Sequence, residues 1–207
     1  MKQHSITLMR ILMTILIILS AGIAGCSSPA PSPQAPSASR VPAKTLSTIA
    51  PSEMVLQPSD FPVNVTLLEK GERNVSEMRN WALDHGWKGG YYADYEKNDR
   101  NSPTGTIIEQ VISVYPAENI TLIVPDTVNI WKNWSAEDRN VTVEELSLPT
   151  IGDSSSALRA SDKSDNTQSY IIAFVKYDVY EQFWTNGTAG DYETLKQMAG
   201  IAAAKIR

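Results

Sequence analysis

Residues 169–184 read SYIIAFVKYDVYEQFW, and this stretch decides the fold. Both halves, 169–176 and 178–184, are rich in the β-branched and aromatic residues that favour strands. Because hardly any chain separates the two halves, they are expected to pair as an antiparallel hairpin. The stretch therefore predicts the strongest pair of strands in the molecule, and the other elements are placed around it.

Further strands and helices are predicted on the N-terminal and C-terminal sides of this hairpin. Residues 106–115 have few polar positions, which indicates a strand in the interior of a sheet. Residues 191–206 carry the apolar stripe of an amphipathic helix. A helix over 125–134 would begin at Pro125, because proline interrupts a helix interior. Shorter helices, strands or turns are predicted at 52–56, 63–70, 90–95, 98–105, 141–146, 156–160 and 185–188.

Residues 74–85 also fit a single helix. Four apolar side chains recur at the spacing of one helical face, and Gly86 suits the position just beyond the C-terminus of a helix. The predicted buried face consists of Val75, Met78, Trp81 and Ala82.

The order of these elements indicates the fold class. Consecutive strands outnumber the helices, so the sequence predicts an α+β fold in which helices pack on an antiparallel sheet. About 150 residues follow the N-terminal segments, which is enough for one domain with a substantial core. We therefore assign residues 51–207 to a single globular domain.

The N-terminus has the three parts of a secretory signal peptide. Lys2 and Arg10 supply positive charge, residues 11–19 are apolar apart from Thr14, and small residues follow. The stretch 11–25 has fifteen residues, whereas a helix that crosses a bilayer needs about 20. The sequence therefore predicts a cleaved signal peptide at residues 1–25 rather than a permanent membrane helix.

Cys26 is the only cysteine, and it directly follows the signal peptide. The stretch Ile23-Ala24-Gly25-Cys26 resembles the lipobox of prokaryotic lipoproteins, which implies cleavage before Cys26 and lipid on its sulfur. A free thiol is the alternative. Residues 26–50 are rich in Pro, Ser and Ala, a composition typical of an extended linker that does not fold. We expect the domain to be held by lipid at the outer, extracytoplasmic face of the cell membrane.

Composition limits the partners and the stabilising chemistry of the mature chain. Without Lys2 and Arg10, 16 Lys plus Arg face 23 Asp plus Glu, so the net charge falls from −5 to −7. An acidic chain of this kind has no electrostatic footprint for nucleic acid. A single cysteine permits no intramolecular disulfide, so stability has to come from an ordinary core.

Residues Pro149-Thr150-Ile151-Gly152-Asp153-Ser154-Ser155-Ser156-Ala157 form a recognisable segment. It resembles the Pro-x-Ile-Gly-Asp-x-Ser-x-Ala stretch of uncharacterised secreted lipoproteins of archaea and bacteria, where a β-hairpin and a C-terminal helix follow. That family is similar to sheet-and-helix domains such as the PsbP/Mog1-like fold, brings no known activity, and implies an archaeal source. From the residues alone, Gly152 can adopt a positive φ and Asp153 can accept hydrogen bonds from nearby amides, so a structural turn is expected.

The mature chain has few side chains for common catalytic chemistry. Gly152-Asp153-Ser154 superficially resembles an esterase block, but a serine nucleophile needs a histidine, and His85 is the only one left. A helix C-terminus explains His85 through the helix dipole. One histidine and one lipidated cysteine do not make a zinc, haem or iron–sulfur site. We therefore predict no catalytic residue, no cofactor and no metal ligand.

Two sets of residues leave alternatives open. Adjacent glutamates at 144 and 145 would point to opposite faces of a strand, which argues against a glycosidase pair. An aromatic cluster suits either a binding platform or ordinary core packing, and core packing is the commoner role. The cluster comprises Trp81, Trp87, Tyr91, Tyr92 and Tyr95.

Six of the eleven asparagines begin an Asn-x-Ser/Thr sequon. This number exceeds chance and fits an exported glycoprotein, although alternating polar residues on strands would also raise it. The candidate sites for N-glycosylation are Asn64, Asn74, Asn119, Asn133, Asn140 and Asn186.

Together these features favour a lipid-anchored extracytoplasmic protein with a binding or accessory role over an enzyme. Its expected contacts are the membrane, through lipid on Cys26, and a protein or glycan partner. Two alternatives stay open: a glycan hydrolase that uses carboxylates, and an electron-transport accessory of the PsbP type, which rests on fold analogy alone.

Overall fold

The computed structural model describes residues 46–97, 105–186 and 191–207, which belong to one compact unit. Seven strands form one sheet in the order β1-β2-β3-β7-β6-β5-β4, and every neighbouring pair is antiparallel. The strands are β1 (Val65–Glu72), β2 (Gly89–Lys97), β3 (Thr106–Val114), β4 (Val141–Leu146), β5 (Ser154–Asp162), β6 (Thr167–Lys176) and β7 (Val179–Asn186). The helices are α2 (Pro51–Met54), α3 (Asn80–Asp84), α4 (Ile120–Glu137) and α5 (Tyr192–Lys205), with 3-10 turns η2 (Pro58–Asp60) and η3 (Val75–Glu77). The predicted α+β fold is confirmed.

The β6–β7 hairpin lies at the middle of the sheet, as its sequence predicts. Lys176 pairs with Val179, so only Tyr177 and Asp178 form the turn. Tyr177 has a φ of 60°, an uncommon value for a residue with a side chain. Its amide donates to Asp153 Oδ2 at 2.8 Å, and the Asp153 amide donates to the Val175 carbonyl at 2.7 Å. The segment before β5 therefore supports the central hairpin, and the structural turn predicted there is confirmed.

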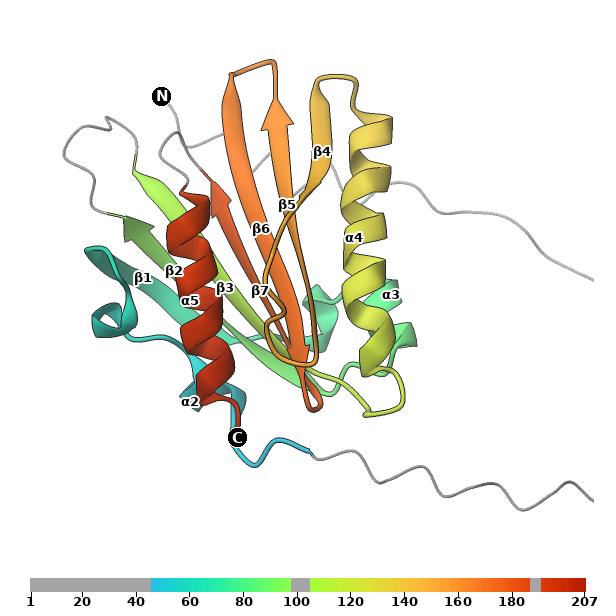
Figure 1. The fold of residues 1–207 in the computed structure, drawn as a ribbon. Helices are drawn as coiled ribbons and strands as arrows, with labels where there is room; N and C mark the ends of the chain where they lie inside the picture. Colours follow the sequence, from blue (N-terminus) through green and yellow to red (C-terminus); the bar gives the residue numbers. More distant parts are fainter. Residues whose placement is uncertain (1–45, 98–104, 187–190) are drawn as a thin grey trace, which may run out of the picture. The chain divides into compact units, whose positions relative to one another are not determined.

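Strand alternation divides the core between the two faces of the sheet. On one face, α2 and α5 cover a cluster that includes Ile112, Phe174 and Phe183. On the other face, α3 and α4 cover two smaller clusters built around Tyr180 and Ile171 (Figure 1). Both faces of the central strands are therefore buried, which explains their near-continuous apolar sequences.

Two predicted helices have different bounds. The expected helix over 74–85 is instead η3 followed by α3, because Met78 and Arg79 are extended between them. Val75 is consequently 63% exposed rather than on a buried face, whereas Met78 and Ala82 are buried. The helix expected over 125–134 runs from Ile120 to Glu137, so Pro125 lies inside it and not at its start. The carbonyl that loses its donor at Pro125 belongs to Thr121, which is exposed to solvent.

The chain enters the domain at one end of the sheet, next to the end of α5. The amides of Ser47 and Thr48 donate to Asp178 Oδ1 at 2.7 Å and to the Arg207 carbonyl at 2.9 Å. We call this the tether end (Figure 1). It also contains the residues Glu72, Gly89, Val114, Val179 and Lys176, where strands begin or end. The opposite end, which we call the far end, contains Val65, Lys97, Thr106, Asn186, Thr167, Asp162 and Val141.

Within the described ranges, no helix has both the length and the apolar character needed to cross a membrane. The signal peptide, Cys26 and most of the linker lie outside these ranges, as do residues 98–104 and 187–188 of two predicted turns. Thr185 and Asn186, predicted in the second turn, instead belong to β7, because they continue its pairing with β3.

A matched pair of glycine substitutions tests the support of the central hairpin. Gly152 has a φ of 65°, and a Cβ there would lie 2.3 Å from the Val175 carbonyl oxygen. Gly152→Ala should therefore lower the free energy of unfolding by at least about 2 kcal/mol. Gly200 lies in α5 with nothing near an added Cβ, so Gly200→Ala should raise it by up to about 1 kcal/mol. Urea denaturation of both variants measures the difference, and similar values would contradict this role for Gly152.

Candidate functional site

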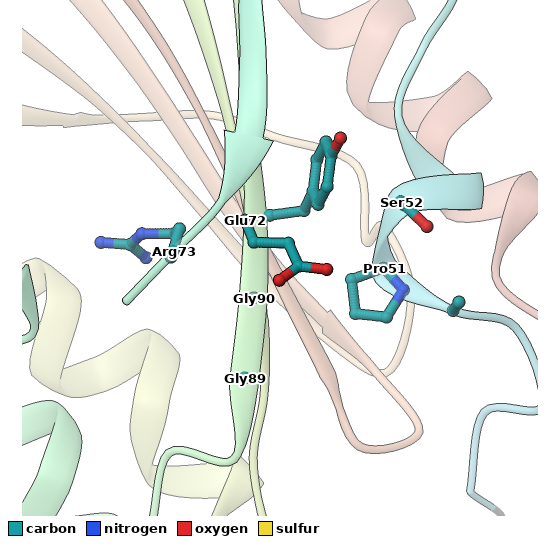
Figure 2. Close-up of a pocket in the computed structure, with 8 residues that line it drawn as sticks. Pro51, Ser52, Glu72, Arg73, Gly89 and Gly90 are labelled. Atoms are coloured by element: carbon teal, nitrogen blue, oxygen red, sulfur yellow. The ribbon is translucent and has the colours of Figure 1, made fainter. Parts of the chain in front are cut away.

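A cavity of about 270 Å³ opens at the tether end, between the start of α2 and the corner where β1 ends and β2 begins. Figure 2 shows Pro51 and Ser52 on one side and Glu72 with Gly89 and Gly90 on the other. The cavity is lined by Ala50, Pro51, Ser52, Glu72, Arg73, Gly89, Gly90 and Tyr91.

Strand register places an aromatic ring beside a carboxylate in this cavity. Glu72 and Tyr91 are direct partners in the β1–β2 pairing, so their side chains share one face of the sheet. The Glu72 carboxylate points toward Pro51 (Figure 2) and has no ion pair or hydrogen bond with any described residue. A carboxylate that lines a cavity together with an aromatic ring is suited to a cationic group.

The neighbouring Arg73 does not neutralise Glu72. Its side chain points away from Glu72 in Figure 2, and Nη1 donates to Ser113 Oγ at 3.2 Å on the opposite face of the sheet. Burial raises the pKa of Tyr115 on that face to about 12, although the Arg73 charge opposes the rise. The positive charge of Arg73 is therefore directed at the Tyr115 and Tyr180 cluster, and the charge within the cavity is that of Glu72.

Two glycines of β2 line the cavity on the side of the sheet. A Cβ on Gly90 would lie 2.4 Å from the Ile112 carbonyl oxygen, so glycine is required where β2 approaches β3. A Cβ on Gly89 would meet nothing within 4 Å. A larger side chain at Gly89, which shares the face of Tyr91, would narrow the cavity, whereas one at Gly90 would point toward Ser113 on the opposite face.

The predicted aromatic cluster does not form one platform. Tyr95 is fully buried, and its hydroxyl donates to the Leu56 carbonyl at 2.6 Å. Trp81 and Trp87 pack against the core cluster under α4, where Trp87 Nε1 donates to Ser113 Oγ at 3.3 Å. Only Tyr91 lines the cavity. Core packing therefore accounts for most of these rings.

The candidate carboxylates are dispersed. Glu144 pairs with Arg159 of β5 and Glu145 with Lys132 of α4, so the two glutamates lie on opposite faces as expected. Asp94 and Glu109 are register partners on β2 and β3, but neither lines the cavity. In the described ranges no group of three or more His, Cys, Asp or Glu side chains is placed to hold a metal ion.

His85 connects two helices on one face of the sheet. Its Nδ1 donates to the Trp81 carbonyl at 2.7 Å, and Nε2 lies 3.0 Å from Asp126 Oδ2 of α4. The histidine therefore holds the end of α3 against α4. The helix dipole, which explains a histidine at this position of the sequence, does not account for this contact with α4.

A polar network crosses the core beneath α2 and α5. Gln110 Nε2 donates to Glu181 Oε2 at 2.9 Å, and Gln110 Oε1 accepts from the Leu56 amide at 3.0 Å. Glu181 is fully buried, and its Oε1 has no hydrogen-bond partner among the described residues. Burial raises the pKa of Glu181 to about 8, against the smaller lowering effects of Gln110 and Lys205. Glu181 stands between Val179 and Phe183 on the same buried face of β7, so the sequence pattern already indicates a buried carboxyl group at this position.

The cavity residues, in contrast, have little sequence signal. Glu72 is an ordinary charged residue near a strand end, and its pairing with Tyr91 depends on a register shift between Leu67 and Glu69. Of the predicted site residues, Cys26 lies outside the described ranges and the six sequon asparagines lie inside them. None of the six lines the cavity.

Glu181→Gln should change how stability depends on pH. An unfolded glutamate titrates near 4.5 and the folded one near 8, so between these values the folded state holds the proton more tightly. Wild-type stability should therefore fall as pH rises from 4.5 to 8, by on the order of a few kcal/mol. Glu181→Gln should abolish this fall in stability and be more stable than the wild type at pH 8. Glu53→Gln, at an exposed position of α2, should keep the pH dependence of the wild type. Equal slopes in all three proteins, measured by urea denaturation, would show that Glu181 is ionised in the fold.

Comparison with known proteins supports the fold and gives no family. A scan against protein-family models finds no match, and a search of curated proteins finds none either. Among solved structures, the chain is similar to the extracellular domain of PknH from Mycobacterium tuberculosis, with a TM-score of 0.56 and 10% sequence identity. The match covers 76% of this chain and 96% of that domain, and at this identity it shows a shared fold.

Proposed function

We propose that this chain is a lipid-anchored extracytoplasmic binding domain, which uses the cavity at its tether end to hold a basic group of a partner. The observation that carries this proposal is the Glu72 carboxylate, which faces a cavity beside Tyr91 and has no partner of its own among the described residues. A non-catalytic, accessory role agrees with the small number of reactive side chains in the mature sequence.

The chemistry of the cavity favours a lysine or arginine side chain. The face of an aromatic ring attracts a cation, and a neighbouring carboxylate adds a charged hydrogen-bond acceptor. The net charge of −7 predicted for the mature chain would add long-range attraction for a basic partner. The lining offers a single carboxylate, which suits binding better than the two-carboxylate chemistry of glycan hydrolysis.

The position of the cavity suits a partner at the membrane. Ala50 and Pro51 of the lining follow within three residues of Thr48, where the chain joins the fold. An extended Pro-rich linker from Cys26, about twenty residues long, would reach roughly 60 Å. The shared fold with an extracellular domain of a mycobacterial protein adds support for an extracytoplasmic location.

Cys26→Ser tests the anchor. Without the thiol no acyl chain can be attached to sulfur, so the variant should move from the membrane fraction to the soluble fraction of the cells that make the protein. Ser28→Ala, two residues away, should leave the protein in the membrane. Retention of Cys26→Ser in the membrane fraction would show that lipid on this residue is not the anchor.

Glu72→Gln tests the cavity. Titration with N-acetyl-lysine methylamide, followed by NMR of labelled protein, should shift the amide signals of Gly89, Gly90 and Tyr91. The norleucine analogue, which lacks the charge, should shift them far less. Glu72→Gln should weaken the lysine response by about fivefold, whereas Glu69→Gln, on the same strand but outside the cavity, should not. Equal responses to the two probes would refute a cation site.

A further inference from the structure

Both free edges of the sheet begin at a sequon. Among the described strands, β1 pairs only with β2 and β4 only with β5, so in this part of the chain each has one edge without a neighbouring strand. Asn64 directly precedes β1, and Asn140 directly precedes β4. Both asparagines are exposed. An unpaired strand edge is a template for pairing with another chain, so a bulky group directly before its first residue would block that pairing.

The surroundings of the six sequon asparagines divide them into two groups. Asn119 is half-buried between α3 and α4, and its Nδ2 donates to the His85 carbonyl at 3.0 Å. Asn74 Nδ2 donates to Glu77 Oε1 at 3.4 Å at the start of η3. The other four side chains have no hydrogen bond to any described residue, and like Asn74 they are exposed: Asn64, Asn133, Asn140 and Asn186.

None of these four asparagines lies at the tether end of the sheet. Val65, Val141 and Asn186 belong to the far end of the sheet, so Asn64, Asn140 and Asn186 lie there. Asn133 lies in the last turns of α4, which ends shortly before Asn140. The two asparagines with bonded amides, Asn74 and Asn119, follow the tether-end strand termini Glu72 and Val114 in the sequence. The four sequons without a bonded side chain are therefore kept apart from the cavity, whereas Asn74, which is also exposed, directly follows the lining residue Arg73.

We propose that N-linked glycans are carried at Asn64, Asn133, Asn140 and Asn186, and that those at Asn64 and Asn140 prevent the two edge strands from pairing with other chains. The donor is a lipid-phosphate-linked oligosaccharide of the producing cell. Asn Nδ2 forms a bond to the anomeric carbon and loses one proton, and the lipid phosphate leaves with the electron pair of the broken C–O bond. This inference is independent of the cation site.

The exposed surface of β1 shows why a glycan is useful there. Leu68 is 51% exposed at the position where the β1–β2 register shifts. The shift bends the strand, and Glu69 and Lys70 add charge, which are two other devices that limit edge pairing. The first residues of the strand, before the shift, have neither device. A glycan on Asn64 would cover that part.

Glycopeptide mapping tests the assignment. The full-length protein, purified from the cells that produce it, is digested and each sequon peptide is examined by mass spectrometry before and after removal of the glycans. We expect modified Asn64, Asn133, Asn140 and Asn186 and unmodified Asn74 and Asn119. A glycan on Asn119 or Asn74, or an unmodified Asn64 or Asn140, would overturn the proposal.

Two double variants, each missing two of the four glycans, test the protective role. Asn64→Gln with Asn140→Gln removes the edge glycans, and Asn133→Gln with Asn186→Gln removes the same number elsewhere. In detergent, sedimentation should show at least a severalfold larger oligomeric fraction for the first protein only, with unchanged circular dichroism in both. Equal sedimentation of the two variants would refute edge protection. Lysine binding at the cavity should be unchanged in both, which keeps this test separate from that of the proposed function.

Discussion

The pairing of β3 with β7 is the interaction on which the rest of the fold depends. It joins a three-stranded unit, β1-β2-β3, to a four-stranded unit, β7-β6-β5-β4, across a long separation in sequence. The same register brings Gln110 opposite Phe183 and next to Glu181, so the polar network beneath α2 exists only when these two strands pair. Because Gln110 also accepts from the Leu56 amide, this pairing positions the segment that leads from the cavity into the sheet.

The sequence predicts the local elements well where a single periodicity dominates. The β6–β7 hairpin and the helix at α5 follow from their apolar patterns, and the turn at Gly152 follows from residue type. The stretch 74–85 shows the limit of this reasoning, because apolar spacing alone does not reveal that Met78 and Arg79 are extended. Pro125 shows another limit, since the helix continues through it where Thr121, the residue whose carbonyl loses its donor, is exposed.

The candidate site could not be predicted from the sequence either, because its residues become neighbours only in the folded chain. Glu72 and Tyr91 are nineteen positions apart, and only the register of an edge strand with an irregularity makes them neighbours. Pro51 arrives from a third segment, whose position depends on contacts with β2 and β3. A cavity assembled from three such segments leaves no motif in the sequence, whereas the predicted lipobox and the sequons are continuous in the chain and can be found without the fold.

The hydrogen bonds of Ser47 and Thr48 to Asp178 and Arg207 have a mechanical consequence. A pulling force between a membrane anchor and a molecule held in the cavity would pass through residues 46–52 and the β1–β2 corner. Through the Ser47–Asp178 hydrogen bond the force would also reach the turn between β6 and β7, so part of it would cross the β7–β3 and β3–β2 pairings. The central strands would therefore share the load with the short segment around Pro51.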